Sequence, residues 1–241
     1  MSFDGTNNNY DTMLPSMGRK RYLFGAVNVA GRIYVCGGTD GVSATNSVES
    51  WSPGDAGWSP EGPMRQIREW HAAVTGPDGR VYALGGADPA GGTVFRSVEA
   101  YAVAQKTPRW QAVASMLSTR WAFGAAVGVD GRIYAVGGSN LQGYVTTAEA
   151  YGPLFTVTPT SAKAGDTVSI SGANFAATAR VIIHLGTPTG TALASATSDG
   201  NGALAATSVV IPPGTGAASI RLYAVDDKSN YPVSRPFTIQ P

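Results

Sequence analysis

Few residues of this chain have the types and spacing that catalysis or metal binding would need. Its 241 residues include two histidines, His71 and His184, and a single cysteine, Cys36. The sequence contains no HExxH, GxSxG, P-loop or EF-hand pattern. One cysteine cannot form an intrachain disulfide or a multi-cysteine metal site. We therefore expect no catalytic residues, no metal and no cofactor, and we interpret Cys36 as a small buried side chain.

Arginine and aromatic residues recur together, and their chemistry suits binding. They occur in the segments GRKRY (18–22), MRQIREWH (64–71) and MLSTRWAF (116–123). Aromatic faces stack on sugars and guanidinium groups pair with carboxylates, so such a site would suit a glycan, a carboxylate or an acidic peptide. The same arginines could instead tie loops to strands. The candidate ligand-binding residues are Arg21, Tyr22, Arg68, Trp70, His71, Arg120 and Trp121.

The arginine segments belong to a longer repeat. Each precedes a strand that ends in two glycines: GRIYVCGG (31–38), GRVYALGG (79–86) and GRIYAVGG (131–138). Each glycine pair is followed by a polar, glycine-rich loop that suits adaptable contacts (39–45, 87–95 and 139–146). A strand with a glutamate follows, at Glu49, Glu99 and Glu149, and then a strand from a tryptophan to a methionine, at 58–64 and 110–116. The pattern predicts four short strands per full repeat, and glutamates paired with the repeated arginines.

The glycine pair, the glutamate two residues before an aromatic residue and the spaced tryptophan together resemble kelch repeats, over about residues 10–152. The resemblance implies a β-propeller in which each repeat is one four-stranded blade. Kelch propellers also include copper-radical oxidases similar to galactose oxidase and a bacterial sialic-acid epimerase. The oxidases need two histidines, two tyrosines and a cysteine, but this region has only one histidine, His71, and one cysteine, Cys36, and neither lies in the family's local motif. The acid and base residues of the epimerase cannot be mapped onto this sequence.

The number of repeats raises the question of how the ring closes. YDTMLPSM (10–17) matches the tryptophan-to-methionine strand with Tyr10 in the tryptophan position, whereas the third repeat breaks off at 151–153 without such a strand. Propellers typically have four to eight blades, so three cannot close a ring. We therefore expect either a fragment of a longer chain with further blades, or a homodimer that forms a six-bladed ring in which each 10–17 strand completes the partner's third blade.

From residue 154 tryptophan disappears and alanine, threonine and serine dominate. Seven short strands are predicted here: 155–158, 166–171, 179–185, 191–197, 202–211, 217–225 and 233–239. Their spacing indicates an antiparallel sandwich. The segment SAKAGDTVSISGANF (161–175) resembles the start of the immunoglobulin-like domains shared by plexins and transcription factors, and of Ig-like modules on secreted bacterial proteins. We expect two domains, a kelch-repeat domain at 1–152 and an Ig-like stalk at 153–241.

The leading hypothesis is therefore an all-β, non-catalytic binding protein: a partial kelch propeller of three four-stranded blades on an Ig-like β-sandwich, with a glycan or another protein as ligand. The alternative is a kelch-type enzyme, a copper-radical oxidase or a sugar epimerase, with part of its site on missing blades. A net charge of +1 gives no electrostatic case for nucleic acid.

The expected location follows from the Ig-like resemblance, which implies a bacterial, extracellular or cell-surface protein. No apolar run approaches the roughly 20 residues that span a bilayer, so we expect no membrane insertion. The start of the chain lacks the features of a signal peptide, which would instead fit a cytoplasmic location or a missing N-terminus.

Overall fold

The computed structural model describes residues 2–3, 10–11, 14–105 and 108–241. Within these residues the secondary structure consists of strands and turns, with no helix that could cross a membrane. The chain forms two compact units. The first comprises residues 1–75, 79–125 and 136–148, and the second comprises 76–78, 126–135 and 149–241. Residues 76–78, 126–135 and 149–152, which the sequence assigns to the repeat domain, are thus grouped with the second unit.

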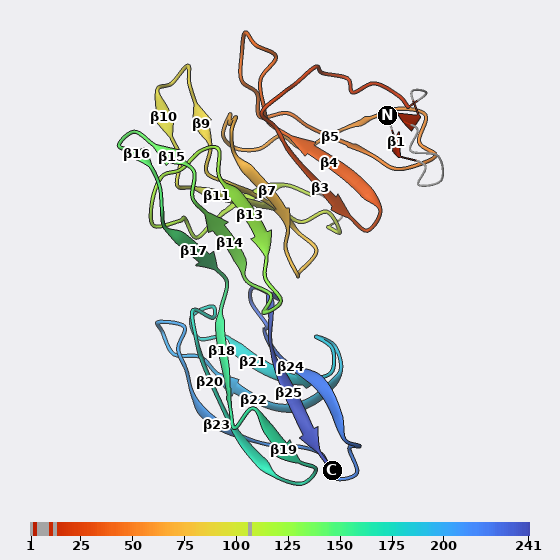
Figure 1. Cartoon of the computed structure of the whole chain (residues 1–241), viewed down its shortest axis with the longest axis vertical. Coiled ribbons are helices and arrows are strands. Elements are labelled where there is room, and N and C mark those ends of the chain that lie inside the picture. Colours follow the sequence, from red (N-terminus) through yellow and green to blue (C-terminus); the bar gives the residue numbers. More distant parts are fainter. Residues whose placement is uncertain (1, 4–9, 12–13, 106–107) are drawn as a thin grey trace. The chain divides into compact units, whose positions relative to one another are not determined.

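Each of the first two repeats forms one four-stranded antiparallel sheet (Figure 1). The first sheet has the order β3 (Gly25–Val29), β4 (Arg32–Cys36), β5 (Val48–Trp51) and β6 (Ser59–Glu61). The second has the order β7 (Ala72–Thr75), β8 (Val81–Leu84), β11 (Val98–Tyr101) and β12 (Trp110–Val113). Alternate residues of β3 are buried and exposed, as expected for a strand whose side chains point to opposite faces. The predicted four-strand repeat is confirmed in these two copies.

The third repeat forms a sheet of three strands, β13 (Gly124–Val127), β14 (Ile133–Val136) and β17 (Ala148–Tyr151). The segment 10–17 adds no strand to it. Within that segment β2 (Tyr10–Asp11) pairs with β1 (Ser2–Phe3), residues 12–13 lie outside the described part, and Leu14–Met17 belong to no strand. Two hairpins follow the glycine pairs of the second and third repeats: β9 (Ala87–Asp88) with β10 (Thr93–Val94), and β15 (Ser139–Asn140) with β16 (Gly143–Tyr144).

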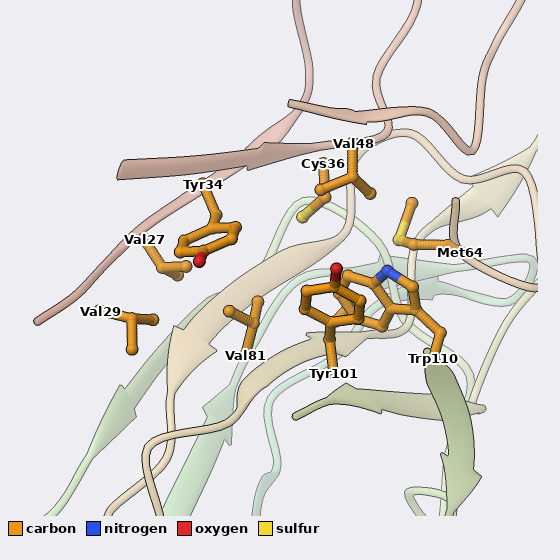
Figure 2. Close-up of a cluster of buried hydrophobic side chains, with 10 residues drawn as sticks. Val27, Val29, Tyr34, Cys36, Val48, Met64, Val81, Tyr101 and Trp110 are labelled. Carbon is orange, nitrogen blue, oxygen red and sulfur yellow. The ribbon is translucent and has the colours of Figure 1, made fainter. Parts of the chain in front are cut away.

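The core of the first unit lies between the first two sheets (Figure 2). The first sheet contributes Val27, Val29, Tyr34, Cys36 and Val48. The second contributes Val81, Ala83, Tyr101 and Trp110, and Met64 joins them from the segment between β6 and β7. The Tyr34 and Tyr101 rings meet edge to face at 6.4 Å, and Tyr101 stacks on Trp110 at 5.2 Å. Burying a large apolar side chain contributes about 1.5–3 kcal/mol, so this shared cluster holds the two sheets together.

Two further sheets lie wholly within the second unit. One has the order β18 (Leu154–Thr158), β20 (Thr167–Ala173) and β23 (Leu204–Val210). The other has the order β19 (Ser161–Lys163), β25 (Pro232–Gln240), β24 (Ala218–Asp226), β21 (Arg180–Leu185) and β22 (Thr191–Thr197). All seven predicted strands occur. The sequence missed β19, a three-residue strand that pairs parallel to β25, so the unit is not wholly antiparallel.

Candidate binding surface

The arginine segments and the loops after the glycine pairs meet at one end of the three sheets. Tyr22 pairs with Thr39, Glu69 with Ala87, and Trp121 with Ser139, each through isolated antiparallel bridges. These bridges hold the residue after each arginine beside the start of the following loop or hairpin. We call this region the hairpin end, defined as residues 18–24, 39–45, 65–71, 87–95, 117–123 and 139–146. It lies entirely within the first unit.

The three candidate arginines are buried, and each makes the same contacts in its own repeat. Arg68 Nη1 donates to the carbonyl oxygens of Gly85 (2.6 Å) and Ser97 (3.2 Å). Arg21 makes this pair of bonds to Gly37 and Ser47, and Arg120 makes it to Gly137 and Thr147. Each guanidinium therefore joins the end of the glycine strand to the start of the glutamate strand. Their side chains have little or no exposed surface with which to contact a ligand directly.

Two of the repeated glutamates complete this framework. Glu99 accepts Arg68 Nη2 at 2.7 Å and also the backbone N–H groups of Arg65 (2.7 Å) and Gln66 (3.2 Å). Glu49 binds Arg21 and the N–H groups of Gly18 and Arg19 in the same way. The prediction that these glutamates pair with the repeated arginines is confirmed for both. Each carboxylate fixes the loop that leads into its arginine.

The candidate aromatic residues, in contrast, reach the surface. Tyr22 is 52% exposed, Trp70 is 43% exposed and Trp121 is half-buried. Trp70 is not equivalent to the other two, because the bridges align Tyr22 and Trp121 with Glu69. Trp70 instead aligns with Leu23 and Ala122, and all three have positive φ angles, of 56°, 56° and 50°. Since three different residue types share this left-handed conformation, it is a property of the repeat, and it turns the Trp70 side chain outward.

Further apolar side chains gather at the hairpin end. Among the residues that the structure describes, the exposed large hydrophobic ones at this end are Tyr22, Val42, Ile67, Trp70, Leu117, Leu141 and Tyr144. Exposed basic residues lie on these loops or next to them: Lys20 and Arg65 are within the hairpin end, and Arg96 directly follows its 87–95 loop. Of these apolar residues, only Tyr22 and Trp70 were candidates from the sequence. A single apolar residue within a polar loop is no signal in the sequence, and it becomes informative only when the loops are known to converge.

His71 is buried with Cys36 between the first two sheets. Its Nε2 atom lies 3.5 Å from the Cys36 sulfur. Burial, with the positive charge of Arg68, lowers the pKa of His71 to about 3, and burial raises the pKa of Cys36 to about 12. Both side chains are therefore neutral at pH 7. The described residues contain no group of three or more His, Cys, Asp or Glu side chains that could hold a metal, so this pair does not fit a copper site.

Replacing His71 by phenylalanine, the residue at the equivalent positions 24 and 123, is expected to flatten the pH dependence of stability. Between about pH 6.5 and 3 the unfolded state binds a proton that the buried native imidazole does not, so native stability falls as pH falls. At about pH 4.5 the wild type should lose roughly 2–3 kcal/mol that the variant keeps. Urea denaturation at pH 7 and at about pH 4.5, followed by tryptophan fluorescence, measures the free energy of unfolding of both proteins. Equal losses in the two proteins would contradict it.

Comparisons with known proteins agree with the repeat pattern. A sequence model of the Kelch motif matches residues 20–65. The human Kelch-like protein 33 is 33% identical over 145 residues, which cover 58% of this chain and 26% of that protein. The chain thus contains a kelch-repeat region, and it spans about a quarter of the length of this relative. The matched relative is human, and the predicted bacterial origin stays a prediction.

A solved structure is also similar. It is a novel fungal alcohol oxidase with catalytic diversity among the AA5 family, in complex with copper, with a TM-score of 0.47 and 18% identity. The alignment covers 92% of this chain and 55% of the oxidase chain. At this level of similarity the match carries no argument about activity.

Proposed function

We propose that this protein is a non-catalytic interaction protein whose hairpin end binds a segment of another protein. The observation that carries the proposal is the gathering of exposed apolar side chains on the loops of all three repeats. Kelch repeats usually mediate protein interactions, and the kelch-repeat region supports this role. The first unit would act as a partial propeller of three blades, and the Ig-like sandwich of the second unit as its stalk.

The framework beneath the loops favours tight binding. The buried arginine and glutamate side chains tie each loop to its sheet, so little conformational entropy is lost when a partner is bound. Exposed aromatic side chains on a rigid support are typical anchors of protein interfaces. In this proposal Trp70 and Tyr22 make the contacts, and the arginines position the loops that carry them.

The chemistry of the partner follows from the charges at the hairpin end. Lys20, Arg65 and Arg96 are exposed beside the apolar side chains. A peptide segment that combines apolar and acidic residues would match both features. A glycan would use the aromatic faces but not the aliphatic side chains Val42, Leu117 and Leu141. We therefore favour a protein ligand. The extracellular or cell-surface location is a separate part of the proposal, and it rests on the Ig-like resemblance of residues 161–175.

Selection of a displayed random-peptide library on the whole chain tests the proposal. We expect enriched peptides to carry acidic and apolar residues and to bind more weakly at high salt, since exposed charge pairs are screened. Trp70→Ala should weaken their binding at least about tenfold, because truncating an aromatic hot spot costs more than about 1.4 kcal/mol. Affinities are measured by isothermal titration calorimetry.

Val210→Ala, a half-exposed position in the second unit, serves as the matched control and should leave the affinity unchanged. Peptides that bind the Trp70→Ala protein as well as the wild type would refute the assignment of the surface. A glycan array is run in parallel. Binding of a neutral glycan that is lost in Trp70→Ala, without peptide enrichment, would replace the protein partner by a sugar.

A further inference from the structure

Neighbouring sheets of the first unit are joined by the same two backbone hydrogen bonds at each junction. Between the first and second sheets, the Gly38 N–H donates to Arg68 O (2.9 Å) and the Trp70 N–H donates to Leu23 O (3.0 Å). Between the second and third, the Gly86 N–H donates to Arg120 O (2.8 Å) and the Ala122 N–H donates to Trp70 O (2.9 Å). Each junction therefore needs one donor and one acceptor from each sheet.

The apolar contacts at the junctions repeat in the same way. Cys36 in the first sheet is 0% exposed, and Leu84, the equivalent residue of the second sheet, is 1% exposed. A Cβ atom on Gly37 would lie 2.8 Å from the Met64 methyl carbon and 2.7 Å from the His71 ring. On Gly85 it would lie 2.9 Å from the methyl carbon of Met116 and from the Phe123 ring. One side of each sheet is thus covered by a methionine and a ring from the next repeat.

The corresponding side of the third sheet is open. Val136, the equivalent of Cys36 and Leu84, is 54% exposed, and Ala148 is also exposed. A Cβ atom on Gly137 would meet nothing closer than Val145 O at 3.6 Å. Among the described residues, no backbone partner lies within hydrogen-bond distance of the Gly138 N–H or the Ala122 carbonyl. The third sheet therefore offers one donor, one acceptor and an uncovered apolar side.

The first sheet offers the complementary backbone groups on its side away from the second sheet. The Arg21 carbonyl and the Leu23 N–H, equivalents of the groups used at both junctions, have no backbone partner among the described residues. Met17 is the first-repeat equivalent of Met64 and Met116. Phe24 is the equivalent of His71 and Phe123. Together with Val35 and Trp58, Met17 and Phe24 line a groove of about 620 Å³. This groove, which Arg19 and Lys20 also line, is the space that a neighbouring sheet would fill.

We propose that two copies of this chain associate through these sides, with the third sheet of each copy packed on the first sheet of the other. The contact repeats the two junctions already present within the chain, and it would form twice in a closed pair of copies. In this contact the Gly138 N–H donates to the partner's Arg21 carbonyl, and the Leu23 N–H donates to the partner's Ala122 carbonyl. Val136 of one copy enters the groove that Met17 and Phe24 line in the other. The hairpin end of one copy then continues into that of the other.

Sedimentation velocity of the full chain over about 1–200 µM tests the proposal, in the concentration range where an interface of standard size has a measurable Kd. We expect a monomer–dimer equilibrium. Val136→Lys and Met17→Glu should each raise the Kd at least about tenfold, since each puts a charge into an apolar contact. Mixing the two variants should restore dimers, because one contact then joins Lys to Glu and the other is wild type.

Val210→Lys is the matched control, since Val210 is exposed to nearly the same extent, 51%, in the second unit. It should dimerise like the wild type. Tryptophan emission and urea denaturation at low concentration establish that the variants are folded. A wild-type chain that stays monomeric, one that grows beyond two copies with concentration, or a Val136→Lys chain that dimerises normally would each overturn the proposal. Peptide binding by monomeric Val136→Lys is scored separately, so this proposal and the proposed function can fail independently.

Discussion

Replacing Glu99 by alanine is expected to lower the free energy of unfolding of the first unit by about 3–5 kcal/mol, the cost of leaving one partner of a buried ion pair uncompensated. Glu99 and Arg68 are almost wholly buried, and their side chains meet at 2.7 Å. The alanine variant would leave the guanidinium charge and two backbone N–H groups without this acceptor. Few single substitutions in the chain should cost as much.

Tryptophan fluorescence can follow the unfolding of the first unit, because of where the tryptophans lie. All five tryptophans of the chain, Trp51, Trp58, Trp70, Trp110 and Trp121, lie in the first unit. Fluorescence during urea denaturation, at a fixed low protein concentration, therefore measures the unfolding of that unit alone. Glu99→Gln keeps the size and one oxygen acceptor but removes the charge, so it should lose less than Glu99→Ala. Asp88→Ala, a carboxylate in a hairpin, is the control and should cost less than about 1 kcal/mol. A Glu99→Ala loss as small as that of Asp88→Ala would show that the framework is dispensable.

Gly37→Ala and Gly137→Ala form a matched pair with very different expected effects. Both glycines have positive φ angles, of 65° and 68°, so alanine suffers nearly the same backbone strain of about 1–2 kcal/mol at either position. At Gly37 the added Cβ would also lie 2.5 Å from the Arg68 carbonyl oxygen, a backbone atom that cannot turn aside. At Gly137 the nearest atom is 3.6 Å away.

We therefore expect Gly37→Ala to lose about 2 kcal/mol or more beyond the loss in Gly137→Ala, since overpacking costs about 1–3 kcal/mol. Tryptophan-detected urea denaturation at a concentration where the chain is monomeric measures both. Gly85→Ala, whose Cβ would lie 2.6 Å from Arg120 O, should behave like Gly37→Ala. Equal losses at positions 37 and 137 would mean that the glycine is required for its φ angle alone, and that the close approach of the next sheet costs nothing.

Much of the first unit could be predicted from the repeats. Three copies of the glycine strand predicted β4, β8 and β14, because each is a short continuous apolar run bounded by glycines, which is typical of a buried strand. The glutamate and arginine positions predicted an ion pair in each repeat, since a charge that recurs inside an apolar repeat must be paired, and the pairs of Glu49 and Glu99 are confirmed. The strand expected across 10–17 is seen only at Tyr10–Asp11, where it pairs with Ser2–Phe3. A single isolated strand pattern cannot specify which sheet edge it joins.

The candidate site was less predictable. The arginines and aromatic residues are adjacent in the sequence, so the pattern grouped Arg68 with Trp70 as ligand contacts. In the structure Arg68 points into its sheet, to Ser97 and Glu99, while Trp70 points outward from a left-handed turn. Val42, Leu117 and Tyr144 carried no signal at all, because each is one apolar residue in a polar loop.

The sequence by itself determined the all-β composition, the kelch-repeat region and the residues that tie each repeat together, since these depend on contacts within one repeat. Only the tertiary structure decided which side chains are exposed and which side of each sheet is open. Cys36, Leu84 and Val136 occupy the same place in nearly identical strands, yet the first two are buried and the third is half exposed. Their burial depends on a methionine and a ring from the following repeat, and the third sheet has no following repeat in this chain.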